Sequence, residues 1–278
     1  MEATEFAREF ALREDPNYVP QGSEESVFEA AFRTRIPLVV KGPTGCGKTR
    51  FIEHMAYRLE LPLVTVSCHE DLTAADLVGR FLLKDDQTFW QDGPLTLAVR
   101  YGGICYLDEV VEARKDTTVI IHSLTDDRRM LYLYKTGEVL RAHPRFMMVL
   151  SYNPGYQSVV KDLKQSTKQR FASLGFDHPP AEVEARIISS ESGLPPEKSL
   201  RLARMGARIR ELAGFGLEEG VSSRLLVYVG RLVRGGLSAR EACTAALSRT
   251  LTEDPEVARS IEEIVELHFG ELDDDLDS

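Results

Sequence analysis

Short runs of apolar residues alternate with amphipathic segments over roughly the first two-thirds of the chain. Aliphatic and β-branched residues in unbroken runs of four or five predict short strands that are buried on both faces. Amphipathic patterns between these runs predict helices over 48–59 and 116–125, and Ser23 marks the start of a helix that ends before Pro37. This alternation predicts an α/β domain of three layers with a parallel sheet. The predicted strands are Leu38–Lys41, Leu63–Val66, Ile104–Leu107, Phe146–Leu150 and, with a weaker pattern, Leu174–Phe176.

The strand pattern disappears after Pro179-Pro180, and only helical patterns follow. We therefore expect a large α/β domain over 1–181 and a small all-helical domain over 182–270. The acidic tail over 271–278 is expected to be disordered because it is dense in like charges. The helices predicted for the small domain cover 182–191, 197–213, 222–234, 238–250 and 255–268.

Two insertions interrupt the large domain. The segment over 79–93 carries Phe81, Phe89 and Trp90 in a polar setting, so we expect these aromatic side chains to face a partner or a pore. The segment over 130–141 contains two β-prone runs around Gly137, which predicts a β-hairpin.

Composition excludes several classes of function. The chain has 278 residues, 43% of them hydrophobic, with 34 basic and 44 acidic side chains and a net charge of −10. This negative charge disfavours unspecific nucleic-acid binding. We expect no membrane span, because no apolar run approaches the ~20 residues required. The amino terminus lacks the pattern of a secretory signal, and the 4 cysteines form no CxxC pair, so we expect buried thiols and a cytoplasmic protein.

A glycine-rich motif between the first predicted strand and the helix over 48–59 predicts nucleotide binding. It fits the pattern G-x-x-x-x-G-K-[ST], in which backbone N–H groups surround phosphate oxygens at a helix N-terminus. Lys48 is expected to reach the β and γ phosphates, and the Thr49 hydroxyl to ligate Mg²⁺. The expected ATP-binding residues are Gly42, Pro43, Thr44, Gly45, Cys46, Gly47, Lys48 and Thr49.

Polar residues follow two further predicted strands. The strand over 104–107 runs into Asp108-Glu109, the pattern of a Walker B motif. Asp108 is expected to bind Mg²⁺ through water, and Glu109 to activate the attacking water as a general base, which indicates ATP hydrolysis. Asn153 follows the strand over 146–150, where an amide can orient that water or contact the γ-phosphate.

These motifs, together with Arg170-Phe171 and Ser222-Ser223-Arg224, resemble the MoxR branch of the AAA+ ATPases over about residues 20–250. The segments 76–80, 93–95 and 102–109 are most similar to the CbbQ/NorQ/NirQ subgroup. The resemblance implies an AAA+ P-loop fold with a helical lid, in which Asn153 is sensor 1 and Arg224 is sensor 2. It also implies that Arg170 is an arginine finger acting on the neighbouring subunit. The segments over 79–93 and 130–141 match the helix-2 insert and the pre-sensor-1 hairpin.

The resemblance further implies a ring, expected to be a homohexamer, that works with a CbbO-type adaptor bearing a von Willebrand factor A domain. The implied client is Rubisco, from which the motor would drive release of inhibitory sugar phosphates. The alternative client is nitric oxide reductase, with activation or metal-site assembly as the task. From the residues alone, a small-molecule kinase with a P-loop is a further alternative, although such a kinase needs neither Asn153 nor a helical second domain.

Overall fold

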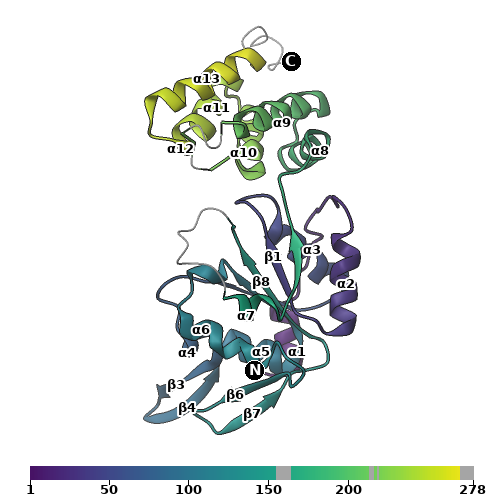
Figure 1. Ribbon diagram of the computed structural model, residues 1–278, viewed down its shortest axis with the longest axis vertical. Coiled ribbons are helices and arrows are strands. Elements are labelled where there is room, and N and C mark those ends of the chain that lie inside the picture. Colours follow the sequence, from purple (N-terminus) through teal and green to yellow (C-terminus); the bar gives the residue numbers. More distant parts are fainter. Residues whose placement is uncertain (155–163, 213–215, 218, 270–278) are drawn as a thin grey trace. The chain divides into compact units, whose positions relative to one another are not determined.

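A computed structural model describes residues 1–154, 164–212, 216–217 and 219–269 of the chain (Figure 1). The chain divides into two compact units. Unit 1 comprises Met1–Gly42 and Lys48–Phe176, and unit 2 comprises Asp177–Ser278 together with Pro43–Gly47. The predicted acidic tail over 271–278 lies outside the described residues. Within the described ranges, no helix has both the length and the hydropathy needed to cross a bilayer.

Unit 1 is built on a sheet of five parallel strands in the order β2-β5-β8-β1-β9. The five strands predicted from the sequence are therefore confirmed, with small differences at their ends. Strand β8 is buried along its whole length, as a central strand covered on both faces must be. The strands are β1 (Leu38–Lys41), β2 (Leu63–Ser67), β5 (Gly103–Asp108), β8 (Phe146–Tyr152) and β9 (Ala172–Gly175).

Alternate side chains of the strands enter two separate cores, which gives the three layers that the pattern predicts. On one face, Tyr106 and Val149 pack in a cluster with side chains of α2 (Glu24–Thr34) and α3 (Lys48–Arg58). On the other face, Cys105 and Leu150 pack with Leu95 of α5 (Pro94–Tyr101) and with side chains of α1 (Ala3–Glu9). Residues two apart along a strand share a face, so Tyr106 and Asp108 share the face toward α3.

Some helices of unit 1 differ from the prediction. Ser23 is the N-cap residue of α2, but its side chain makes no capping hydrogen bond. The segment predicted as one helix over 116–125 is α-helical only to Ile120 and continues as a 3₁₀ turn over 121–123. The hydrophobic pattern predicts neither α4 nor α5. The remaining elements are α4 (Ala74–Val78), η1 (Val110–Glu112), α6 (Lys115–Ile120), η2 (Ile121–Ser123) and α7 (Gln165–Lys168).

Both insertions are two-stranded antiparallel hairpins. The hairpin predicted over 130–141 consists of β6 (Met130–Leu133) and β7 (Glu138–Arg141). The aromatic insertion over 79–93 forms a second hairpin, β3 (Gly79–Lys84) and β4 (Gln87–Asp92), which the sequence does not predict.

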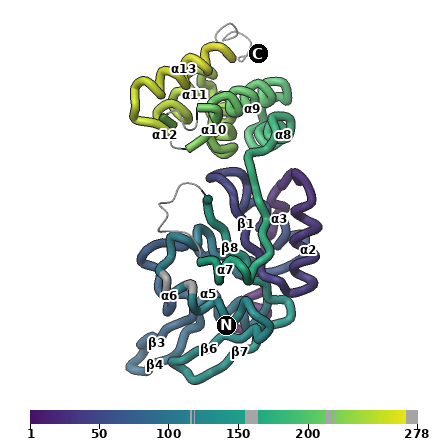
Figure 2. Tube along the Cα trace, in the orientation of Figure 1, coloured from purple at the N-terminus to yellow at the C-terminus, as the bar shows by residue number. Residues whose placement is uncertain are grey.

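Unit 2 contains only helices among its described elements (Figure 2). Apolar side chains from all the long helices form one core cluster, which includes Leu202, Leu226 and Ile261. The helix predicted over 238–250 is interrupted by a π-helical turn, η3 (Thr244–Ser248), between two short α-helices. The helices are α8 (Ala181–Ser192), α9 (Pro196–Arg210), α10 (Ser223–Arg234), α11 (Ala239–Cys243), α12 (Arg249–Leu251) and α13 (Pro255–Phe269).

Candidate active site

The glycine-rich loop connects β1 to α3, and its glycines are required by the backbone. Gly45 and Gly47 have φ values of 69° and 101°, in the left-handed region where a side chain is strained. A Cβ atom on Gly42 would lie 2.4 Å from the carbonyl oxygen of Phe176. The loop therefore has the close-packed, left-handed backbone that turns N–H groups toward a phosphate.

Lys48 starts α3 and is buried, with 8% of its surface exposed. Its ammonium group donates to the carbonyl oxygen of Gly42 at 2.8 Å and to the side-chain oxygen of Asn153 at 2.6 Å. A buried ammonium is stable only where polar groups replace its hydration. The amide after β8 therefore stands next to the lysine of the glycine-rich loop.

Asp108 and Glu109 stand at the carboxyl end of β5. Oδ1 of Asp108 accepts a hydrogen bond from the Tyr106 hydroxyl at 2.7 Å and a second, short one from the Ser151 hydroxyl. Glu109 has the left-handed backbone (φ 53°, ψ 45°), and its N–H donates to the Ser151 oxygen at 3.0 Å. Oε1 of Glu109 accepts from the Asn153 amide at 3.5 Å, the outer limit for such a bond.

Tyr106 connects the two residues that the sequence assigns to Mg²⁺. Its hydroxyl lies 3.3 Å from the Thr49 hydroxyl and donates to Asp108. Burial, and then the negative charge of Asp108, raise the pKa of Tyr106 well above its usual range, so the phenol keeps its proton. Sequence reasoning missed Tyr106 and Ser151; the available signal is that they stand two residues before Asp108 and Asn153, on the same strand faces.

The donor set around Thr49 and Asp108 fits Mg²⁺. One hydroxyl and one carboxylate are hard oxygen ligands, and Mg²⁺ in nucleotide sites takes its remaining ligands from phosphates and water. In the part of the chain that the structure describes, no group of three or more acidic, histidine or cysteine side chains forms a metal cage. Such a set fits a metal that enters together with a nucleotide.

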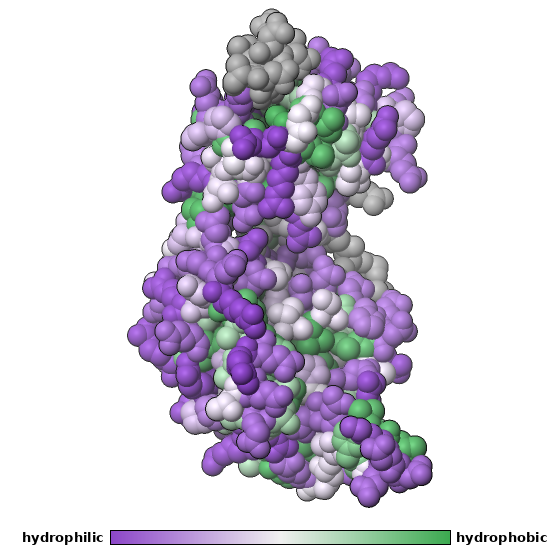
Figure 3. All heavy atoms as spheres, turned by 180° about the vertical axis from the view of Figure 1, so that it is seen from behind, coloured by the Kyte–Doolittle hydropathy of each residue, from purple (hydrophilic) through white to green (hydrophobic). Residues whose placement is uncertain are grey.

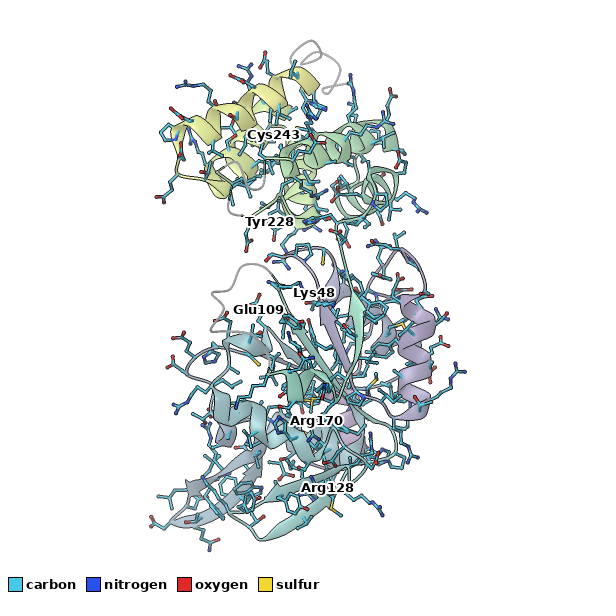
Figure 4. All side chains as sticks on the ribbon, viewed as in Figure 1. Lys48, Glu109, Arg128, Arg170, Tyr228 and Cys243 are labelled. Atoms are coloured by element: carbon cyan, nitrogen blue, oxygen red, sulfur yellow. The ribbon has the colours of Figure 1, made fainter. Side chains whose placement is uncertain are left out.

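Arg170 lies apart from this cluster. It precedes β9, at the amino-terminal edge of the sheet, whereas Lys48 and Glu109 lie at the carboxyl edge (Figure 4). Its guanidinium is 3.6 Å from the carboxylate of Asp126 and donates to the carbonyl oxygen of His122 at 3.4 Å. The structure therefore brings together Lys48, Thr49, Asp108, Glu109 and Asn153, but not Arg170.

Arg224 belongs to unit 2, where it is exposed in the first turn of α10. The helix starts at a capped N-terminus, since the Ser222 hydroxyl accepts from the N–H of Leu225 at 3.2 Å. Beside it, Ser223 donates to the fully buried carboxylate of Glu184, which also accepts two hydrogen bonds from Arg210 at 2.8 and 2.6 Å. This network fixes the start of α10 against α8 and α9.

The 4 cysteines are all free thiols and all buried, as the sequence predicts. Cys68 follows β2, and its backbone N–H donates to the carbonyl oxygen of Asp108 at the end of β5. Burial, and then the charges of Asp108 and Glu109, raise the pKa of Cys68 to about 12. This thiol is therefore an unreactive filler beside the site.

Comparison with known proteins assigns the family. Residues 37–171 match the AAA domain of the dynein-related subfamily, and residues 184–268 match the CbbQ/NirQ/NorQ C-terminal family. Protein CbbQ of Hydrogenophilus thermoluteolus is 54% identical over 266 residues, which is 96% of this chain and 100% of that protein. The denitrification regulatory protein NirQ of Pseudomonas aeruginosa is 57% identical over 255 residues, 92% of this chain and 98% of that protein.

The fold is also found among solved structures. The P216G mutant of Thermotoga maritima RuvB superposes with a TM-score of 0.55 at 15% identity, covering 91% of this chain and 73% of that one. At this identity the likeness concerns the fold alone, and that fold is a P-loop core followed by a helical region. The matched domains, the relatives and the nucleotide-site geometry agree: the chain belongs to the CbbQ/NirQ/NorQ family of AAA+ ATPases, and its activity is ATP hydrolysis.

Proposed function

We propose that the chain is the motor subunit of a ring that uses Mg²⁺-dependent ATP hydrolysis to remodel and activate a client enzyme. The observation that carries this proposal is the cluster at the carboxyl edge of the sheet. There Lys48, Asn153 and Glu109 are linked in one hydrogen-bonded row, 2.6 Å for the first pair and 3.5 Å for the second. A phosphate-binding cation, a water-orienting amide and a general base are the groups that phosphoryl transfer to water requires.

In the proposed site, each residue has a separate task. The N–H groups of the loop over 42–49 bind the phosphates, and Lys48 exchanges its present partners for phosphate oxygens. Glu109 accepts a proton from the attacking water, and Asn153 holds that water or the γ-phosphate. Thr49 and Asp108 would hold Mg²⁺, which would neutralise charge on the phosphate oxygens.

Arg170 supports an assembled motor. Arg170 lies at the opposite edge of the sheet from Lys48 and Glu109, so it does not contact the site of its own subunit (Figure 4). An arginine that completes the site of the next subunit typically accelerates phosphoryl transfer ~10³–10⁵-fold. The resulting interface is head-to-tail, and it closes as a ring, which we propose to be a homohexamer. Arg224 is proposed as sensor 2, the cation of the helical unit that responds to the γ-phosphate.

The two hairpins are the proposed surface toward the client and adaptor. Phe81, Leu83 and Phe89 of the β3–β4 hairpin are 48%, 73% and 42% exposed, and Figure 3 shows hydrophobic side chains gathered there at its lower right. Between this hairpin, β6 and the α6 region lies a pocket of about 360 Å³, lined mainly by apolar groups that include Trp90 and Tyr132. Large apolar side chains exposed on one short hairpin are typical of protein interaction sites.

The proposed client is Rubisco, acted on with a CbbO-type adaptor that bears a von Willebrand factor A domain. The 54% identity to protein CbbQ supports this choice. The 57% identity to a denitrification regulatory protein supports the alternative, activation or metal-site assembly of nitric oxide reductase. The 4 free, buried thiols support a cytoplasmic location for either task.

The ring is tested by kinetics. ATPase activity per subunit should rise with protein concentration, and equal activity at extreme dilution would overturn the shared site. Subunits carrying Arg170→Ala and subunits carrying Lys48→Ala should be nearly inactive separately. A mixture should recover activity, because Arg170 of one subunit then meets the intact loop of its neighbour.

The client is tested by affinity purification of the tagged chain from its own cells. Recovery of Rubisco with the adaptor supports the first client, and recovery of nitric oxide reductase supports the alternative. Addition of ATP with the purified partners should then restore activity to an inhibited client enzyme, whereas a Lys48→Ala chain should not.

A further inference from the structure

The environment of Asp108 points to two residues without an assigned role. We propose that Tyr106 and Ser151 are positioning residues that prepare Thr49 and Asp108 to hold Mg²⁺ with the nucleotide. This proposal rests on the proposed function of the site and deepens it. Neither residue touches the reacting atoms in this arrangement; both act through the side chains that they hold.

The strand order makes these contacts possible. Strands β5 and β8 are neighbours in parallel register, with Tyr106 opposite Val149 and Leu107 opposite Leu150. Side chains alternate between the faces, so Tyr106 and Asp108 of β5 share a face with Ser151 at the end of β8. Thr49, in the first turn of α3, covers that same face.

Counting protons fixes the direction of each hydrogen bond. A carboxylate only accepts, so the single phenolic proton of Tyr106 goes to Asp108. The Thr49 hydroxyl must then donate its own proton toward the Tyr106 oxygen, 3.3 Å away. This leaves the lone pairs of the Thr49 oxygen available, which is the state that a metal ligand needs.

Ser151 of β8 orients Asp108 from the neighbouring strand, through its hydroxyl group. Its proton goes to Oδ1 of Asp108, and its oxygen accepts the N–H of Glu109 at 3.0 Å. Both donors to Asp108 therefore bind one oxygen, and within the described residues Oδ2 accepts no hydrogen bond. The carboxylate is held in one orientation with its second oxygen available, and the left-handed backbone of Glu109 is held by the same serine.

A row of donors that all point toward one carboxylate is mutually polarising, because each bond strengthens the next. Removing one hydroxyl should therefore weaken the metal end of the site rather than the phosphate-binding loop. Loss of a hydrogen bond to a charged group is expected to reduce affinity about tenfold.

The test measures ADP binding to the full chain by calorimetry, once in Mg²⁺ and once in EDTA. Tyr106→Phe and Ser151→Ala should weaken ADP binding about tenfold in Mg²⁺ and less than about twofold in EDTA. Electron paramagnetic resonance of Mn²⁺ with ADP should show correspondingly weaker Mn²⁺ binding. Ser151→Thr, which keeps the hydroxyl, should restore both readouts.

Matched controls separate the site from the scaffold. Tyr57→Phe removes a half-exposed phenol from α3, and Ser248→Ala removes a buried hydroxyl that has no partner in the described residues. Neither should change ADP binding in either condition. If Tyr106→Phe fails to fold, the comparison of ADP and Mn²⁺ binding between Ser151→Ala and Ser151→Thr tests the inference.

Two results would overturn the inference. Equal loss of ADP affinity in Mg²⁺ and in EDTA would mean that the two hydroxyls support the phosphate-binding loop. Unchanged ADP affinity in both conditions would mean that they support neither the loop nor the metal ligands. Failure of the proposed function is distinguishable, since the unmodified chain would then gain no ADP affinity from Mg²⁺.

Discussion

The ammonium nitrogen of Lys48 lies 2.6 Å from the side-chain oxygen of Asn153, although the two residues are 105 positions apart in the chain. The contact exists because β8 lies directly beside β1, so that the loop after β1 and the residue after β8 meet at one edge of the sheet. In the proposed site, a phosphate that binds Lys48 displaces this amide. We therefore propose that nucleotide binding and the position of Asn153 are coupled.

Asn153→Ala should separate binding from turnover. In the unbound chain the Asn153 side chain accepts a hydrogen bond from Lys48 that a phosphate would replace. Loss of this side chain should therefore leave ADP affinity within about threefold of that of the unmodified chain. Turnover should fall about 100-fold, as for other single donors that stabilise developing charge. Calorimetry and a steady-state ATPase assay measure the two effects, and a parallel loss of affinity would contradict the coupling.

Glu109→Gln should bind ATP and fail to hydrolyse it. The amide keeps the shape of the side chain but cannot accept a proton from water, so turnover should fall about 100- to 10,000-fold. Glu53→Gln on the exposed face of α3 is the matched control and should be as active as the unmodified chain. Retained turnover in Glu109→Gln would exclude this glutamate as the general base.

Arg170→Ala should abolish hydrolysis with little loss of stability. The ion pair with Asp126 is partly exposed and 3.6 Å long, so it should contribute at most about 1 kcal/mol. ATPase activity should fall about 1,000-fold. Arg128→Ala is the control, because Arg128 pairs with the same carboxylate at 2.6 Å. Equal losses of ATPase activity in the two variants would mean that the position of Asp126, and not the Arg170 guanidinium itself, supports hydrolysis.

Glu184→Ala should destabilise unit 2 by about 3–5 kcal/mol, because it leaves the Arg210 guanidinium buried without its counter-charge. Urea unfolding followed by circular dichroism at 222 nm measures this change. Fluorescence of Trp90, the single tryptophan, reports unit 1 separately and should be little affected. Replacing Glu184 and Arg210 together by methionine should recover most of the stability.

Stability should fall as the pH rises from about 9 to 12. Burial raises the pKa of Cys68, Cys105 and Cys243 to about 12, compared with 9.0 for a free thiol. A raised folded-state pKa means that the contribution is complete below pH 9 and is lost as the unfolded thiols ionise, by ~1.4 kcal/mol per pH unit and thiol at most. Cys243→Ala should flatten this decline, and an unchanged slope would contradict a shift at that thiol.

Local motifs carry most of what the sequence predicts about the site. The glycine-rich loop, Asp108-Glu109 and Asn153 each follow an apolar run, and parallel strands bring their carboxyl ends together. Tyr106 and Ser151 carry no such signature, since their importance arises from the register of β5 against β8. That register is a tertiary property, and a single strand sequence does not encode it.

The missed hairpin has a different cause. The turn between β3 and β4 is made by Asp85 and Asp86, with φ values of 50° and 59°. Two-residue turns of this kind require positive φ at both positions, and the usual signal is Asn-Gly or Asp-Gly. Two aspartates adopt the same backbone at a higher cost, so the turn reads as ordinary polar loop. Helix α5 has a signal that the hydrophobic pattern does not use: Pro94 is its first residue, the position at which proline favours the start of a helix.

Strand β8 places Ser151 beside Asp108, and the residue just after the strand, Asn153, lies between Lys48 and Glu109. Their shared face depends on an even spacing from the buried residues that precede them. Apolar exchanges such as Val149→Ile should be tolerated in Phe146–Leu150, but the insertion or deletion of a single residue there would turn both polar groups into the opposite layer. Length, more than composition, is the property of this strand that mutation cannot change without losing catalysis.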